Sequence, residues 1–248
     1  MNREEWLNSI VNDGLKVCKL LWNVVRELEA IGWKIGYTDT ILPEEIYTKT
    51  KEIFDKHLAS WNQQDPRRVQ IHVKNTINHI YETVPRTIYM SGIGMWRVAI
   101  QNANYSGGNP DKPTEAARKI TLAYCFYHEY YHAVGFIREG TEGYETYYKY
   151  KQSDLIYYLI REEIAAYAFS AAMAAVLYGD KELNMDREAH QFMEPEYRYL
   201  ILFKEHKRYP EGIQQNIRIA HRAYRMLRVF YYRFIKGAIA EKATYDAW

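Results

Sequence analysis

The pentapeptide His128-Glu129-Tyr130-Tyr131-His132, an HExxH motif, is the feature that most constrains how this chain folds. Its two histidines are four positions apart, so they can face one metal ion only when the segment is an α-helix. Neutral imidazole is a good zinc ligand. Glu129 follows the first histidine directly and is placed to take a proton from a metal-activated water. The motif therefore predicts a helix with two zinc ligands, His128 and His132, and one general base, Glu129.

A third ligand is expected further along the chain, because a catalytic zinc ion usually has three protein ligands and one open position. The compact HExxHxxGxxH arrangement is excluded, since position 138 is Arg138. The best remaining donors lie in REEIAAYAFS (161–170), which contains Glu162 and Glu163. Neighbouring positions of a helix diverge by about 100°, so only one of the two glutamates can face the metal. The residues alone leave both open.

The wider pattern predicts a single α+β domain that is mostly helical. Apolar residues recur at helical spacing up to about residue 31, and a further helix is expected after Pro43. The segments VQIHV (69–73), RTIYM (86–90) and WRVAIQ (96–101) are rich in β-branched and aromatic residues, and they predict two or three strands of a small antiparallel sheet. The loop signal SGGNPDKP (106–113) separates this sheet from a helical remainder. The expected parts are N-terminal helices at 1–62, the sheet and metal-binding helices at 69–180, and C-terminal helices at 186–240, all within one domain over 1–248.

Composition narrows the class of protein further. Apolar residues make up 48% of the chain and charged residues 26%, which is ordinary globular usage, and the net charge of +2 excludes a globally basic nucleic-acid binder. No apolar run is long enough to predict a membrane span, and the acidic, amphipathic N-terminus is not typical of a signal peptide. With two cysteines, Cys18 and Cys125, no disulfide framework is indicated, and we expect a cytoplasmic protein.

HEYYH followed about thirty residues later by EIAAYAFS resembles the gluzincin zinc metallopeptidases. The nearest parallels are the ImmA/IrrE-like and HtpX-like families, whose second helix reads E-x-x-A-[ND]-x-F-A. Glu163, Ala166, Phe169 and Ser170 match that pattern, whereas Tyr167 stands where those families have Asn or Asp. The resemblance covers about residues 120–170.

The resemblance implies a Zn²⁺ site of His128, His132 and Glu163, with Glu129 as the base that drives peptide-bond hydrolysis. It also implies an edge strand upstream of the motif that holds an extended peptide or protein substrate by strand addition. RTIYM (86–90) or WRVAIQ (96–101) is expected to be that strand.

An oxyanion donor is also needed for hydrolysis. Tyrosine makes up 24 of the 248 residues, and several tyrosines lie between the two expected ligand helices. Any of these hydroxyls is a candidate donor, although packing of the ring is the more common role of a tyrosine: Tyr144, Tyr147, Tyr148 and Tyr150.

One alternative is a non-catalytic or regulatory metal-binding protein whose basic C-terminal helix binds nucleic acid or a protein partner. Basic side chains share one broad face of this helix, and 212–240 contains no acidic residue: Arg218, Arg222, Arg225, Arg228, Arg233 and Lys236. A solvated face paired with acidic residues elsewhere is the more common outcome for such a stripe.

A second alternative is a carboxylate-bridged di-iron bundle, because Glu129 and His132 also form an E-x-x-H pair. Such bundles need two of these pairs, and no second one occurs in the chain. The other histidines are expected to be surface or packing residues, and Cys125 to be a small core residue: His57, His72, His79, His190, His206 and His221.

Overall fold

The computed structural model describes the parts of the chain that carry the sheet and the HExxH helix. The described residues are 9–36, 38–64, 68–82, 86–100, 115–139, 161–177, 225, 229, 231 and 232. Within them the architecture is α+β and mostly helical, as the sequence predicts. The expected loop at 106–113, the tyrosines at 144–150 and nearly all of the expected C-terminal helices lie outside the described residues.

Two N-terminal helices form where the apolar spacing predicts them. A π-helical turn, η1 (Ser9–Asp13), leads into α2 (Gly14–Ile31), which ends at Gly32 with φ of 71°. That left-handed conformation suits a glycine and closes the helix, because the Gly32 N–H donates to the Glu29 carbonyl. Helix α3 (Glu44–Asn62) starts directly after Pro43, whose fixed φ favours a first turn.

The sheet contains β1 (Gln70–Lys74), β2 (Ile80–Glu82) and β3 (Thr87–Ser91), in the order β1-β3-β2. Strand β2 pairs antiparallel with β3, whereas β1 pairs parallel with it, with Ile71 opposite Ile88. The expected purely antiparallel sheet is therefore wrong, and the sheet is mixed. The reason is the short strand β2, which the sequence pattern did not indicate: it reverses the chain, so that β3 enters between β1 and β2.

The segment 96–101 is the second correction. Residues of the expected strand WRVAIQ belong to α4 (Gly92–Ala99). Ser91 starts this helix, because its Oγ accepts a hydrogen bond from the Gly94 N–H at 2.9 Å. The helix is buried on most sides, and a short, continuously apolar run does not distinguish a buried helix from a buried strand.

The expectation that 86–90 or 96–101 forms the edge strand is therefore also wrong. Within the described sheet β3 is the central strand, and 96–99 is helical. Strand β2 lies at the edge and contacts α5 (Glu115–Glu139), the helix that contains the HExxH motif.

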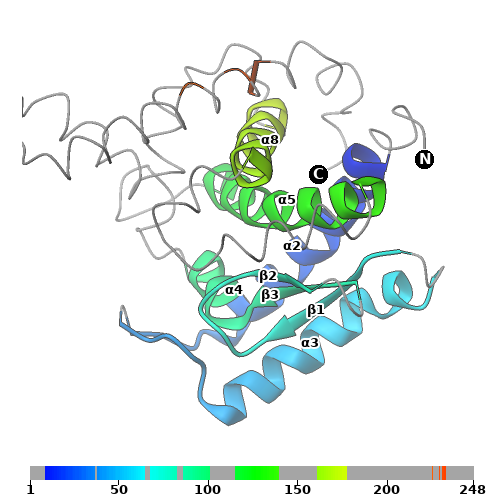
Figure 1. Ribbon diagram of the computed structural model, residues 1–248. Helices are drawn as coiled ribbons and strands as arrows, with labels where there is room; N and C mark the ends of the chain where they lie inside the picture. Colours follow the sequence, from blue (N-terminus) through cyan, green and yellow to red (C-terminus); the bar gives the residue numbers. More distant parts are fainter. Residues whose placement is uncertain are drawn as a thin grey trace, which may run out of the picture.

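Helices enclose the sheet and bring the two ligand helices together (Figure 1). Helix α5 lies over β2 and β3, α3 packs along β1, and α2 contacts α3, α4 and α5. Helix α8 (Arg161–Leu177) packs on α5, so that α5 lies between α8 and the sheet. The HExxH motif is thus in the middle layer of the described structure.

Candidate metal centre

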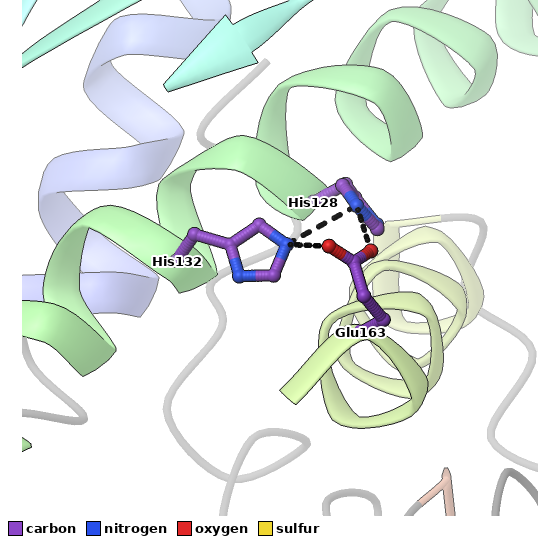
Figure 2. A group of neighbouring side chains, drawn as sticks. All are labelled: His128, His132 and Glu163. Carbon is purple, nitrogen blue, oxygen red and sulfur yellow. Dashed lines mark hydrogen bonds and ion pairs between the residues drawn. The ribbon is translucent and has the colours of Figure 1, made fainter. Parts of the chain in front are cut away.

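Three side chains from α5 and α8 meet at one point (Figure 2). The Nε2 atom of His128 is 3.1 Å from Glu163 Oε2, and the Nε2 atom of His132 is 3.3 Å from Glu163 Oε1. The two Nε2 atoms are 3.3 Å apart. Each residue thus directs a donor atom toward the same small volume, and the three atoms lie within 4.8 Å of one another.

The donor atoms converge closely enough to hold one metal ion. Zinc bonds of about 2.0–2.1 Å at the tetrahedral angle place neighbouring ligand atoms about 3.3 Å apart. The two Nε2 atoms, 3.3 Å apart, agree with that value, and each histidine contacts a different oxygen of the Glu163 carboxylate. A buried His-His-Glu group of this geometry can hold a metal ion, and its donor set is one that zinc accepts.

Burying charged side chains costs free energy unless their charges are compensated by neighbouring groups. The Glu163 side chain is fully buried, and His128 is 8% exposed. Burial by itself raises the pKa of the Glu163 carboxyl, but the charges and hydrogen bonds of His132 and His128 outweigh it and hold that pKa well below its usual value. The carboxylate therefore stays ionised at neutral pH, which is the form that binds a cation.

Aromatic packing between α5 and α8 sets the position of Glu163. Phe169 lies between Tyr127 and Tyr131, with ring centroids 5.8 and 5.4 Å away. These tyrosines are one turn apart, so together they fix Phe169 and hence the rotation and height of α8. Small residues at the contact, such as Ala166, let the two helices approach closely. The Glu162 side chain is outside the described side chains, and Glu163 is the glutamate that meets the histidines.

Tyr167 is half-buried and packs against His128. Its ring centroid is 4.3 Å from that of His128, with the planes tilted by 50°. The His128 Nδ1 atom is buried and has no hydrogen-bond partner among the described residues. A metal-binding histidine usually has its second nitrogen fixed by a hydrogen bond. Here the rings of Tyr167 and His132, with centroids 4.3 and 4.9 Å away, pack against His128 and restrict its rotation.

Glu129 is half-buried on α5, one turn after Cys125. Burial raises the pKa of the Cys125 thiol to about 12, and the negative charge of Glu129 adds to this effect. Cys125 therefore stays a neutral thiol at physiological pH, and it is half-buried rather than the core residue that the sequence predicts. It does not belong to the His128, His132 and Glu163 group.

One histidine near the candidate centre is not marked by the sequence. His79, expected to be a surface or packing residue, directly precedes β2 and interacts electrostatically with His128. No local motif marks it, because it reaches this position only through the pairing of β2 with β3 and the packing of both strands on α5.

Comparisons of the chain with protein-family models, curated proteins and solved structures find no match. None of the described helices is both long and apolar enough to cross a membrane. The single-domain boundaries and the cytoplasmic location remain predictions of the sequence.

Proposed function

We propose that this protein is a zinc-dependent metallopeptidase of the gluzincin type, which hydrolyses peptide bonds in a peptide or protein substrate. The observation that supports the proposal most is the convergence of the His128, His132 and Glu163 donor atoms on one point. A glutamate in the general-base position, Glu129, directly follows the first of these histidines. Structural zinc sites usually use four protein ligands, whereas a three-residue site leaves a position for water and substrate.

Zinc and Glu129 would have separate roles in the hydrolysis. Bound zinc would polarise the scissile carbonyl and lower the pKa of the attacking water. Glu129 removes a proton from that water as its oxygen attacks the carbonyl carbon. The same carboxyl then returns the proton to the amine nitrogen as the C–N bond breaks, so each cycle leaves Glu129 ionised again.

Metal analysis of the purified protein tests the site. We expect one zinc ion per chain in the wild type and loss of that zinc in His132→Ala and Glu163→Ala. Glu162→Gln is the matched control, because its position on the helix diverges by about 100° from that of Glu163. A wild-type protein without zinc, or equal zinc in Glu163→Ala and the wild type, would exclude this site.

Hydrolysis is tested separately with Glu129→Gln. Zinc should stay bound, because Glu129 is not one of the three proposed ligands, while cleavage of a susceptible peptide mixture falls by about 10²-fold or more. Glu115→Gln, at the exposed start of the same helix, should cleave at the wild-type rate. Full cleavage by Glu129→Gln contradicts its role as base. Zinc binding without cleavage in the wild type favours the non-catalytic metal-binding alternative.

A further inference from the structure

Tyr127 directly precedes His128 in α5, and its side chain is fully buried among aromatic rings. Phe126 and Tyr130 of the same helix flank its ring, with centroids 5.4 and 6.4 Å away. On α8 the ring meets Phe169, with a centroid distance of 5.8 Å. Because protein interiors are close-packed, a ring enclosed in this way cannot move without displacing a neighbour.

The N-terminal turn fixes the far end of the same ring. The Tyr127 hydroxyl donates to the Val11 carbonyl of η1 at 3.4 Å. Burial raises the pKa of this hydroxyl well above its usual value, so it stays protonated and remains a donor at neutral pH. Gly14, the first residue of α2, lies against the edge of the ring: a Cβ atom there would be 2.5 Å from Tyr127 Cε1 and 2.9 Å from its oxygen. The close approach of α2 to the ring therefore requires glycine.

On its other side the ring contributes to the position of α8. Phe169 lies between Tyr127 and Tyr131, and it belongs to the same continuous helix as Glu163. A displacement of the helix at Phe169 therefore moves the Glu163 carboxylate as well. Metal sites tolerate changes of only about 0.2 Å in their bond lengths, so a small shift of α8 is enough to weaken binding.

We propose that Tyr127 is a positioning residue of the metal centre, which passes the position of the N-terminal turn through Phe169 to Glu163. The inference rests on the proposed metal site, although it does not require peptidase activity. It makes the affinity for the metal depend on Val11 and Gly14, although Val11 is 116 positions away from Tyr127 in the chain.

Gly14→Ala adds the Cβ atom that the ring of Tyr127 excludes, so the ring has to shift against its neighbours. We expect zinc affinity to fall by about tenfold or more, the usual effect of disturbing a contact that orients a metal ligand. Gly92→Ala is the matched control: Gly92 is also buried and begins α4, and its added Cβ would be 3.0 Å from the flexible end of Leu42. Its zinc affinity should stay within about threefold of the wild-type value. Equal losses in the two variants overturn the proposal.

Substitutions of Tyr127 test the same path from its centre. Tyr127→Phe keeps the ring and should bind zinc within about threefold of the wild type, whereas Tyr127→Leu should lose about tenfold. Because the ring is absent in Tyr127→Leu, adding Gly14→Ala to that variant should cause no further loss. Additive losses in the double variant overturn the proposal. If Gly14→Ala does not fold, the two variants at position 127 decide by themselves, and equal affinities overturn it.

Two spectroscopic measurements report the position of the ligands rather than the stability of the fold. With Co²⁺ in place of Zn²⁺, the visible absorption bands should shift in Gly14→Ala and match the wild type in Gly92→Ala. In the metal-free protein, the ¹³C NMR shift of the Glu163 carboxyl should change in Gly14→Ala but not in Gly92→Ala. An unchanged spectrum of Gly14→Ala in either measurement overturns the proposal. If the wild type binds no metal, the proposed function fails, while the carboxyl shift still decides whether Tyr127 positions Glu163.

Discussion

At the scale of single residues, the candidate metal centre is a group of buried polar side chains that stabilise one another through hydrogen bonds and charge. Glu163 is fully buried, and its carboxylate is stabilised by the two histidines that face it. His128 is in turn fixed by the packing of Tyr167 rather than by a described hydrogen bond at its second nitrogen. The geometry at the site therefore depends on contacts with side chains that need not touch a substrate.

Tyr167 allows this dependence to be measured. Tyr167→Phe keeps the ring against His128, so zinc affinity should stay within about threefold of the wild-type value. Tyr167→Ala removes the ring, and zinc affinity should fall by about 10–100-fold, the usual effect of losing a contact that orients a metal ligand. Competition with a chromogenic chelator measures both affinities. Equal affinities for the Ala and Phe variants would contradict a role of the ring in positioning His128.

The ionisation of His79 leads to a prediction about how the stability of the fold depends on pH. Burial and the nearby His128 lower its pKa in the folded protein to about 4, against 6.5 for the ordinary group. The unfolded chain therefore binds a proton at His79 more readily, and the folded state loses stability as the pH falls from about 6.5 to about 4. One pKa unit corresponds to about 1.4 kcal/mol, so the loss is at most about 3 kcal/mol.

Urea unfolding of the metal-free protein at several pH values tests whether stability falls as the pH is lowered. The wild type should lose more stability than His79→Asn between pH 7 and pH 4.5, because asparagine does not titrate. The two proteins should show the same pH dependence above pH 7. Parallel curves over the whole range would show that His79 ionises in the folded protein as it does in the unfolded chain.

At the scale of elements, the contact between α5 and α8 decides whether the ligands meet. The contact combines aromatic side chains on α5 with Phe169 and small residues on α8, where Ala166, one turn after Glu163, is fully buried. Phe169 inserts between Tyr127 and Tyr131 and fixes the register. A change of helix separation at this contact would displace Glu163 from both histidines at once.

Ala166→Leu should produce such a displacement. Ala166 is fully buried, and adding methylene groups to a well-packed contact costs about 1–3 kcal/mol. We expect a lower free energy of unfolding and, because Glu163 is one turn away on the same helix, zinc affinity reduced by tenfold or more. Ala30→Leu, at an exposed position of α2, is the control and should change neither quantity. Wild-type zinc affinity in Ala166→Leu would mean that the helix contact does not position Glu163.

At the scale of the whole molecule, a metal ion at this site would link two helices that are far apart in sequence. Helix α5 contacts the sheet, α2 and α4, whereas α8 is joined to the described structure chiefly through α5. Since the ligand arrangement forms only when α8 docks, binding of the metal is coupled to folding.

Zinc should therefore raise the thermal stability of the metal-free protein. At a free concentration of about 100 times Kd, the stabilisation is about 2.7 kcal/mol. For a chain of this length that corresponds to a rise in Tm of about 5–10 °C. A thermal scan with and without zinc measures the shift, and His132→Ala should show none. An equal shift in His132→Ala would indicate that zinc stabilises the fold from another site.

Local patterns predicted several parts of this arrangement. HEYYH predicted a helix with both histidines on one face, and that helix is present as α5. The glutamate-bearing segment at 161–170 was also expected to be helical and to pack against the motif, and the structure brings its Glu163 to both histidines. These features follow from helical periodicity, which is a property of neighbouring residues.

Other parts depended on contacts between distant residues. The sequence did not reveal β2, the parallel pairing of β1 with β3 or the helical state of 96–99, since each is stabilised by burial against other elements. The same is true of His79, whose Nδ1 accepts a hydrogen bond from a backbone N–H twelve residues away.

By itself, then, the sequence determined which residues can form helices and which chemistry the HExxH motif can support, because both depend on spacing of a few residues along the chain. The tertiary structure decided which glutamate meets the histidines and what orients His128. The physical reason is that donor atoms 3.1–3.3 Å apart on two helices are positioned by side-chain packing between them, and this packing is specified by the fold as a whole.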